Sequence, residues 1–515
     1  MSELDLDADV LVLGGGLAAT WAALSAADAG ATVVLADKGY CGTSGVTATA
    51  GVSHWLVPPE RRAAAMAERR SIAAGLADDA WMARVLDETW RRLHAYDLPF
   101  PAAVNGRRPY RTIRGPEYLR AMRRLVKRAG VRILDHHPAL ELLADADGRV
   151  RGAAGVRRQH GGGRWRVRAG GVVLATGGCA FRSHLLGARG NTGDGLLMAA
   201  EAGAELSGME LSAYYTPAPA FSTITRSMSY LFGTYVDSAG RELDLPPAEG
   251  RVEALARALL EGPVRVRLDR MPVAIRERLR RVQPNFMIPF DRRGIDPFRD
   301  LFEVTLRGEG TVRGVGGVRV AGPDCATTVP GLWVAGDAAS REPIAGAVSG
   351  GGAQNSAWAV STGTWAGAAA ARAVPEPRHR LRPLGRAGMR PVAATSALSA
   401  EEVAAAVRDE LNPYEKNLFR TDAGLRASLD VLDALWPAVR GGLRGSPVAI
   451  REAAALVAAG RWAYRAALHR PESRGMHRRT DRPGPDPALT TGLHIGGLDR
   501  IWHRYAPVPR EAVAR

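Results

Sequence analysis

Small residues at fixed spacing follow a short apolar run near the start of the chain. Gly14, Gly16 and Ala19 fit the pattern G-x-G-x-x-A, and an Ala-rich stretch follows them. The next apolar run, at residues 32–36, ends in Asp37. A glycine turn between a strand and a helix binds the pyrophosphate of a dinucleotide, and an acidic residue after the second strand binds a ribose hydroxyl. The segment therefore predicts a dinucleotide site.

Three further segments combine a strand pattern with a glycine turn. Residues 169–178 run from an apolar stretch into Ala-Thr-Gly-Gly, residues 191–206 open with a glycine-flanked aspartate, and residues 329–339 contain a Gly-Asp pair after a strand. Segments so far apart favour FAD over NAD, because a nicotinamide dinucleotide is usually bound within one sheet. The residues predicted to contact FAD here and in the first unit are Gly14, Gly16, Leu17, Ala18, Ala19, Asp37, Lys38, Ala175, Thr176, Gly177, Asn191, Asp194, Gly336 and Asp337.

Three consecutive glycines, Gly350, Gly351 and Gly352, precede an Ala-rich stretch that predicts a helix beginning near Asn355. A glycine run costs conformational entropy, so it is expected where the backbone must approach a ligand closely. The N-terminus of the following helix would direct its partial positive charge toward the flavin ring. We therefore predict that the three glycines, Asn355 and Ser356 contact the flavin.

The composition is typical of a globular protein with two or three domains. The chain has 515 residues, of which 46% are hydrophobic. Its three cysteines lie far apart and show no zinc or iron–sulfur ligand spacing, which predicts no metal and fits a reducing cytoplasm. The acidic N-terminus is unlike a secretory signal, and no apolar run approaches the roughly 20 residues of a membrane span.

The net charge of +16 comes mostly from arginines that are spread along the chain. Because they form no clustered basic stripe, a nucleic-acid partner is not expected. The arginine-rich composition is typical of a bacterial source.

The motifs together resemble those of the flavoprotein family of succinate dehydrogenase and fumarate reductase, which includes L-aspartate oxidase and the adenylylsulfate reductase flavoprotein subunit. The resemblance covers most of the chain and rests on GGGLAA at 14–19, SGVTATAG at 44–51, ATGG at 175–178, NTGDG at 191–195, GVGGVRV at 314–320, GLWVAGDA at 331–338 and ESRGMHRRTD at 472–481. Members with covalent FAD carry a histidine in the segment that matches 44–51, where this chain has Gly45. The resemblance therefore implies non-covalent FAD, with contacts in this segment from Thr43, Ser44, Gly45, Thr49 and Gly51.

The chain departs from the family at the substrate side chains. Dicarboxylate enzymes of the family bind substrate with two histidines and two arginines. Here the histidine positions hold tyrosine and Val312, the proton-relay position falls near Ser229, and VSGGG replaces the second substrate arginine. The resemblance thus implies a substrate that is not bound as a simple C4 dicarboxylate. The candidates for substrate contact and proton transfer are Arg226, Tyr214, Tyr215 and Arg313, each weighed against plain packing or solvent exposure.

The expected fold class is α/β, with a Rossmann-like FAD-binding domain, an inserted α+β capping domain and a C-terminal helical domain. The expected boundaries are 1–208 with 322–375 for the FAD-binding domain, 209–321 for the cap, 376–394 for a linker and 395–515 for the helical domain. Leucines and alanines recur at helical spacing within 422–440 and 448–470. The resemblance implies an active site between the cap and the FAD-binding domain. Arg474 and His477 of the ESRGMH motif would lie near its rim, where an interdomain salt bridge is the favoured interpretation over catalysis.

The sequence therefore predicts an FAD-dependent oxidoreductase that moves hydride between flavin N5 and a small polar, anionic metabolite. Its second partner would be O2 or a separate electron acceptor. One alternative is an amine- or amino-acid-type oxidase that yields an imine and H2O2. Another is an electron-transfer subunit that works with a separate iron–sulfur or haem partner, and a third is a non-catalytic flavin-binding scaffold. Homo-oligomerisation stays open.

Overall fold

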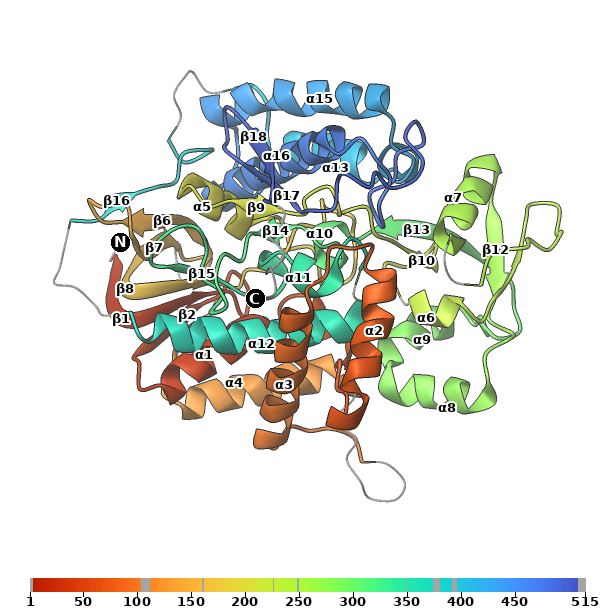
Figure 1. Cartoon of the computed structure of the whole chain (residues 1–515), viewed down its shortest axis with the longest axis horizontal. Helices are drawn as coiled ribbons and strands as arrows, with labels where there is room; N and C mark the ends of the chain where they lie inside the picture. Colours follow the sequence, from red (N-terminus) through yellow and green to blue (C-terminus); the bar gives the residue numbers. More distant parts are fainter. Residues whose placement is uncertain are drawn as a thin grey trace, which may run out of the picture.

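A sheet of eight strands forms the centre of the molecule in the computed structural model (Figure 1). The structure describes residues 3–102, 112–159, 162–225, 227–247, 250–349, 351–373, 380–390 and 396–507. The parallel strands are, in spatial order, β5 (Arg132–Leu134), β2 (Val33–Ala36), β1 (Leu4–Leu13), β8 (Arg164–Leu174) and β15 (Leu332–Val334). Their apolar residues are buried because helices cover both faces of the sheet. The carboxyl ends of these strands meet at one edge.

Antiparallel strands extend the sheet from the first half of β8. The strand β7 (Val150–Val156) pairs with β8, β6 (Ala139–Ala144) pairs with β7, and β16 (Arg382–Pro383) pairs with β6 at the edge. Since β16 lies within residues 376–394, part of the predicted linker is an edge strand of the central sheet.

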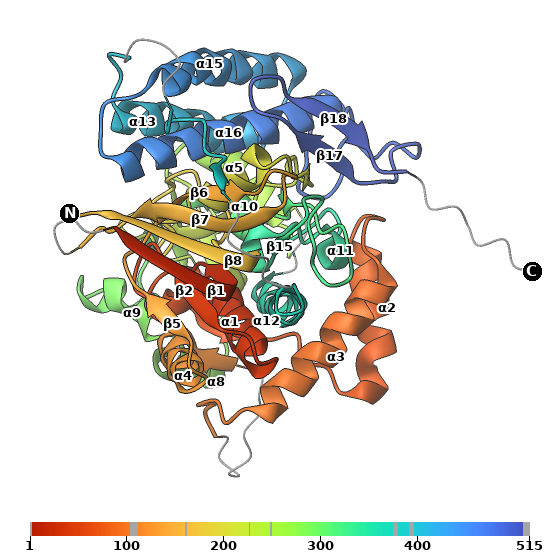
Figure 2. The same ribbon diagram turned by 90° about the vertical axis from the view of Figure 1, so that its left-hand side faces the viewer.

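Helices lie on both sides of the sheet (Figure 2). One side carries α1 (Leu17–Asp28), α3 (Asp79–Ala95), α4 (Gly115–Arg128) and α12 (Gly351–Ala370), and the other side carries α5 (Asp194–Glu201). The helices α1 and α12 pack with their backbones close together: a Cβ on Gly363 would lie 2.4 Å from the carbonyl oxygen of Ala18. The two helices whose N-terminal turns carry the predicted cofactor contacts therefore run side by side.

The cap has its own sheet and its own core (Figure 1). Its antiparallel strands are, in spatial order, β10 (Tyr215–Pro219), β13 (Phe302–Gly308), β12 (Val264–Arg267) and β11 (Thr234–Val236). Its helices are α6 (Ser227–Tyr230), α7 (Arg251–Glu261), α8 (Val273–Val282) and α9 (Pro284–Asp291). The strands and helices lie within the predicted range 209–321, and the core of the cap also includes Leu418 from the C-terminal region.

The C-terminal region is largely helical. It contains α13 (Ala400–Leu411), α14 (Tyr414–Asn417), α15 (Asp422–Gly441) and α16 (Pro447–His469), and the last two correspond to the helical patterns in the sequence. Two strands follow, β17 (Leu493–Gly496) and β18 (Trp502–Tyr505). The strand β17 pairs with β9 (Leu206–Ser207), which also pairs with β14 (Gly317–Val318). The chain end thus returns to the part of the molecule that precedes the cap.

Short elements complete the chain around the carboxyl edge of the sheet. They are η1 (Val46–Thr49), β3 (Gly51–Ser53), η2 (Pro59–Arg61), α2 (Arg62–Ile72), β4 (Thr112–Arg114), α10 (Gly310–Arg313), η3 (Gly336–Ala338) and α11 (Glu342–Ala345). Within the described residues, no helix has the length and apolarity to cross a bilayer. The α/β fold class with a helical C-terminal region is confirmed.

Candidate functional site

The glycine turn after β1 lies at the carboxyl edge of the sheet, packed on one side and open on the other. Gly14 has φ +123°, and a Cβ there would lie 2.2 Å from the carbonyl oxygen of Ala175. At Gly16, the N-cap of α1, a Cβ would meet no atom within 4 Å. The open side faces the free amide groups of the first turn of α1, where Leu17, Ala18 and Ala19 lie. The turn therefore fits a pyrophosphate.

Asp37 lies directly beside this turn and is 6% exposed. Its Oδ2 accepts a hydrogen bond from Ser44 Oγ at 2.5 Å, and the same oxygen lies 2.2 Å from the position of a Cβ on Gly15. Burial raises the pKa of the Asp37 carboxyl, while the hydrogen bonds from Ser44 and Gly39 oppose this shift. Because a ribose hydroxyl would supply another donor, the carboxyl group fits its predicted role.

Lys38 connects two predicted cofactor segments to the C-terminal region. Its Nζ lies 2.5 Å from Asp194 Oδ2, 3.0 Å from Thr192 Oγ1 and 3.0 Å from Glu452 Oε1 on α16. Burial lowers the pKa of Lys38, but the carboxylates of Asp194 and Glu452 outweigh this effect and the pKa is raised. The structure thus brings Lys38 and Asp194 together at the start of α5.

Two predicted contact residues carry buried polar atoms without a hydrogen-bond partner in the described part of the chain. These atoms are Thr176 Oγ1 and both side-chain atoms of Asn355, Nδ2 and Oδ1. An unsatisfied buried polar group costs about 1–3 kcal/mol. A flavin nucleotide would supply donors and acceptors for them, so the residues at this edge fit the predicted cofactor.

The glycine run is part of a helix. The helix α12 begins at Gly351, so the expectation of a start near Asn355 is wrong. Ser349 Oγ accepts a hydrogen bond from Gly351 N at 3.2 Å, which satisfies an amide of the first turn. A Cβ on Gly352 would meet no atom within 4 Å, and the nearest atom to a Cβ on Gly351 is 3.8 Å away. The first turn of α12 therefore borders open space; Gly350 lies outside the described residues.

Open space also surrounds Gly45, which has φ +81° and no atom within 4 Å of the position of a Cβ. Gly51 in contrast is covered by the Gln283 side chain of the cap. The hydroxyls of the neighbouring predicted residues bind protein carbonyls: Thr49 Oγ1 donates to Val46 O at 3.1 Å, and Thr43 Oγ1 donates to Tyr40 O at 3.3 Å. This segment therefore offers a cofactor its backbone and Gly45 more than its hydroxyls.

Two of the remaining predicted contacts are held by other parts of the edge. Gly177 has φ +78° and lies against Asn191, whose Nδ2 is 2.3 Å from the position of a Cβ there. Ser356 Oγ donates to Ser53 O and to Ala353 O, which joins the first turns of α12 to β3. Contacts between distant segments thus hold these parts of the edge together.

Asp337 in η3 forms an ion pair that the sequence reasoning missed. Asp337 Oδ1 accepts a hydrogen bond from Arg341 Nη1 at 2.6 Å, and Arg341 Nη2 donates to Thr311 O at 2.9 Å and to Val312 O at 3.1 Å. Burial raises the pKa of Asp337, and Arg341 opposes the shift. Arg341 therefore joins η3 to α10. The spacing of four residues between an aspartate and an arginine was the available signal.

Arg313 is the best placed of the predicted substrate-binding residues. Its side chain is 26% exposed, its Nε lies 3.5 Å from Glu309 Oε2, and its guanidinium lies 5.9 Å from the centre of the Tyr214 ring. Burial lowers the pKa of Arg313, but Glu309, Tyr214 and Asp337 raise it, so the guanidinium is held in its charged form. Arg313 and Tyr214 therefore present a cation and a phenol together, beside Asp337 of the cofactor edge.

Tyr215 packs against the C-terminal region. It is 3% exposed, and its hydroxyl lies 3.0 Å from Asn412 O and 3.3 Å from Pro413 O. Because side chains alternate along β10, the phenol of Tyr215 points away from Tyr214 and into the C-terminal region. The structure thus places the Tyr215 hydroxyl against the C-terminal region, and its predicted contact with substrate stays a prediction. Arg226 lies outside the described residues.

Arg474 and His477 belong to a buried structural network. Arg474 Nε donates to Glu472 Oε1 at 2.8 Å, and its Nη1 donates to Ala74 O at 2.8 Å. His477 Nδ1 lies 2.8 Å from Arg420 Nη1, and its Nε2 lies 2.8 Å from Arg470 O. Since Arg420 can only donate, Nδ1 accepts and Nε2 donates, and burial lowers the pKa of this neutral imidazole. The motif therefore joins the C-terminal region to the end of α2.

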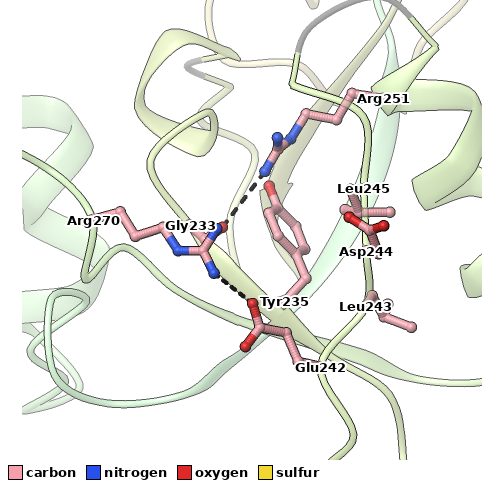
Figure 3. Close-up of a pocket in the computed structure, with 8 residues that line it drawn as sticks. All are labelled: Gly233, Tyr235, Glu242, Leu243, Asp244, Leu245, Arg251 and Arg270. Carbon is pink, nitrogen blue, oxygen red and sulfur yellow. Dashed lines mark hydrogen bonds and ion pairs between the residues drawn. The ribbon is translucent and has the colours of Figure 1, made fainter.

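A pocket of about 370 Å³ lies in the cap and is separate from this edge (Figure 3). It is lined by Gly233, Tyr235, Glu242, Leu243, Asp244, Leu245, Arg251 and Arg270. Arg270 is paired with Glu242, and Arg251 donates to Pro246 O at 3.1 Å. None of the predicted site residues that the structure describes lines this pocket, so its size alone gives it no role in the expected chemistry.

Glu342 at the start of α11 makes stability depend on pH. Its Oε2 accepts a hydrogen bond from Ser207, its Oε1 has no partner among the described residues, and it is 9% exposed. Burial and the nearby Glu210 raise the pKa of Glu342 from 4.5 to about 7. The folded state therefore binds this proton more tightly than the unfolded state, and the contribution to stability falls as the pH rises from 4.5 to 7.

We expect Glu342→Gln to raise the free energy of unfolding above pH 7, relative to the native chain, by up to about 3 kcal/mol. This gain should shrink toward pH 5, as measured by urea unfolding at both pH values. Glu415→Gln, which removes an exposed carboxylate, is the control. A difference that does not change with pH would contradict the prediction.

Comparisons with known proteins agree with the geometry of this edge. Residues 9–354 match the FAD binding domain family. The chain is 28% identical over 373 residues to the L-aspartate oxidase of Streptomyces coelicolor and 33% identical over 241 residues to that of Halobacterium salinarum. These alignments cover 64% and 41% of this chain, and 63% and 45% of the two relatives.

Solved structures share the fold over nearly the whole chain. The E. coli quinol fumarate reductase FrdA superposes with a TM-score of 0.80 and 20% identity, covering 99% of this chain and 98% of that chain. Mycobacterium smegmatis Sdh1 gives a TM-score of 0.78 at 21% identity, covering 99% and 96%. An adenosine-5-phosphosulfate reductase gives 0.76 at 18% identity, covering 99% and 97%. The resemblance inferred from the motifs is confirmed.

Proposed function

The chain belongs to the FAD binding domain family, and on that premise we propose that it is an oxidoreductase that binds FAD non-covalently and acts on a small anionic metabolite. The family, the similarity to two L-aspartate oxidases and the fold shared with a fumarate reductase support an FAD-dependent oxidoreductase. The nature of the substrate and of the FAD linkage is the proposal. The observation that carries it is the half-buried, charged Arg313 beside the cofactor edge.

Non-covalent attachment is supported by the residue at the segment that follows β2. Gly45 offers no side-chain nucleophile, and open space surrounds it. The buried polar atoms of Thr176 and Asn355 provide hydrogen-bonding groups in place of a covalent link. Asp37 would bind the ribose, and the turn at Gly14–Gly16 would bind the pyrophosphate.

Bound FAD supplies two-electron redox chemistry, and the protein orients the substrate. Arg313 would bind a carboxylate or similar anion, because its guanidinium is charged and partly exposed and its ion pair with Glu309 is long, at 3.5 Å. Tyr214 lies beside Arg313, and its phenolic oxygen would hold or move a proton of the substrate. The first turn of α12, with its bare glycines, would let the flavin ring and the backbone approach closely.

An amino-acid oxidase is the second candidate, and the similarity to two L-aspartate oxidases favours it. An electron-transfer subunit with a separate redox partner remains the third. The oxidase and the electron-transfer subunit differ in how fast the reduced flavin reacts with O2.

The test is an anaerobic titration of the purified yellow protein with L-aspartate first, then other amino acids, dicarboxylates, sulfur oxyanion nucleotides and hydrazine-bearing acids. Loss of the flavin absorbance near ~450 nm identifies the reducing substrate. Rapid return of colour in air with one H2O2 per turnover establishes an oxidase, and slow return establishes a dehydrogenase or reductase. If no anionic compound bleaches the flavin while a neutral or cationic compound does, the proposed substrate class is wrong.

Substitution of Arg313 tests the role of this side chain in substrate binding. With the acid that bleaches the flavin, we expect Arg313→Met to raise KM about 10- to 100-fold, since a hydrogen bond to a charged group contributes about 1.5–3 kcal/mol. The KM of Arg313→Lys should lie between those of Arg313→Met and the native chain, because a lysine keeps the charge but not the planar, forked geometry of the guanidinium. Arg299→Met, at a cap arginine that is 85% exposed, should leave KM unchanged. Equal KM values for Arg313→Met and the native chain would exclude Arg313 from substrate binding.

A further inference from the structure

One buried arginine on α2 binds the chain segment that leads into the glycine run at the start of α12. Arg69 is 3% exposed, and its guanidinium donates hydrogen bonds to four main-chain carbonyls. The acceptors are Ile344 O at 3.1 Å, Ala345 O at 2.5 Å, Val348 O at 3.0 Å and Ser349 O at 3.5 Å. The first two belong to the end of α11, and the last two immediately precede the glycine run. A single side chain therefore binds both ends of residues 344–349, the described part of the turn between α11 and α12.

The charge of Arg69 is compensated by carbonyl groups. None of its hydrogen bonds in the described part of the chain goes to a carboxylate, and burial lowers the pKa of Arg69 to about 10. The last carbonyls of a helix carry partial negative charge and have no partner within the helix. Arg69 satisfies those of α11. A buried cation without a carboxylate is costly, and here the cost is offset by hydrogen bonds to the carbonyls of this turn.

The same turn is also held by main-chain hydrogen bonds from the end of α2 and from the C-terminal region. Ala347 N donates to Ala73 O at 3.0 Å, and Ala347 O accepts from Met476 N at 2.8 Å. Gly475 has φ +56°, and a Cβ there would lie 2.2 Å from Ala347 O. The turn therefore lies between α2 and the ESRGMH motif, and α2 is seen beside α11 in Figure 2.

The exit of this turn decides where the first turn of α12 lies. Gly351 and Gly352 border open space, and Asn355 one turn later has the buried amide that finds no partner among the described residues. Arg69 donates a hydrogen bond to the carbonyl of Ser349, and the hydroxyl of Ser349 accepts one from Gly351 N. Ser349 therefore connects the Arg69 guanidinium to the first turn of α12. A shift of this turn by a fraction of an ångström would alter the distance between the glycine backbone and the flavin.

We propose that Arg69 is a positioning residue that fixes Gly351 and Gly352, in the first turn of α12, against the flavin. It would thereby set both the affinity for FAD and the reduction potential of the bound flavin. The proposal rests on the proposed FAD site at Gly351–Gly352. It goes beyond the proposed function because Arg69 is not one of the residues proposed to contact the cofactor. Arg69 contacts main-chain carbonyls instead. The adjacent Arg70 offers a matched control, because it lies on the same helix with a 56% exposed side chain paired to Asp79.

The experiment compares the native chain with Arg69→Met, Arg69→Lys and Arg70→Met. Apoprotein is titrated with FAD to give a dissociation constant, and the midpoint potential of each holoprotein is measured by equilibration with a reference dye. We expect Arg69→Met to raise the FAD dissociation constant about tenfold and to change the affinity for oxidised and reduced flavin unequally. A tenfold inequality moves a two-electron potential by about 30 mV. Arg69→Lys, which keeps the charge but reaches fewer carbonyls, should give a smaller shift in the same direction.

The outcomes separate this inference from the proposed function. A native chain that binds no FAD overturns the proposed function and the inference with it. If the native chain binds FAD, the inference alone can still fail. It is overturned if Arg69→Met and Arg70→Met both bind FAD within twofold of the native affinity and both keep the native midpoint potential. A lower melting temperature with an unchanged potential assigns Arg69 a merely structural role and also overturns it. If Arg69→Met does not fold, Arg69→Lys decides: a native-like potential in that variant contradicts the proposal.

Discussion

Gly16→Val is expected to abolish tight FAD binding while leaving the apoprotein folded. Among the described residues, no atom lies within 4 Å of the position of a Cβ on Gly16, and its φ of −83° with ψ of −165° is extended backbone that valine adopts readily. The added methyl groups would occupy the open side of the turn, in front of the amide groups of α1. We expect the dissociation constant for FAD to rise at least ~1,000-fold, which is about 4 kcal/mol, in fluorescence titrations of apoprotein.

Gly14→Ala is the matched comparison, two residues earlier in the same turn. Its φ of +123° disfavours any side chain, and its Cβ would lie 2.2 Å from Ala175 O. We expect this variant to lose about 2–4 kcal/mol of unfolding free energy in the apoprotein itself. Gly16→Val should stay within about 1 kcal/mol of the native apoprotein. If Gly16→Val binds FAD like the native chain, the pyrophosphate does not lie at this turn.

Arg470→Met is expected to cause the largest loss of stability. Arg470 is 0% exposed, and its guanidinium lies 2.8 Å from Glu210 Oε1 and 2.8 Å from Glu472 Oε1. The other oxygen of Glu210, Oε2, has no partner in the described part of the chain. Removal of the arginine would leave Glu210 as a buried, unpaired carboxylate. Such losses cost about 3–5 kcal/mol, measurable by urea unfolding.

Two further variants show whether the unpaired charge causes this loss. Arg426→Met removes an arginine whose side chain is 62% exposed and paired with Asp422 on the surface of α15, and should cost less than about 1 kcal/mol. The double variant Arg470→Met with Glu210→Gln should recover part of the stability, because it removes the stranded carboxylate. Equal losses for Arg470→Met and Arg426→Met would contradict the buried ion pair.

Local spacing was sufficient to predict the first unit of the fold. The unit of β1, α1 and β2, with its glycine turn and Asp37, is built from contacts between residues that are close in sequence. The residues predicted to be neighbours there do lie together. The helices α15 and α16 likewise follow from their periodic leucines and alanines. For these elements, propensity and burial pattern favour the same structure.

Side-chain directions in the cap and at the turn before α12 could not be predicted in this way. The hydroxyl of Tyr215 binds carbonyls of residues 412 and 413, and nothing in the local sequence shows that this loop packs there. Arg69 finds its acceptors about 275 residues away, so its role depends on tertiary packing alone. The start of α12 at Gly351, despite the low helix propensity of glycine, comes with a hydrogen bond from Gly351 N to the Ser349 hydroxyl that the sequence pattern did not indicate.

The most direct test of the central claim is the release of flavin from the purified holoprotein. The protein is precipitated with acid, and the flavin in the supernatant and on the polypeptide is identified by mass spectrometry and quantified against the chain. The account predicts FAD in the supernatant at close to one molecule per chain and none on the polypeptide. Flavin that remains attached to the precipitated chain would contradict non-covalent binding, and a chain purified and reconstituted with FAD that retains no flavin would contradict the site itself.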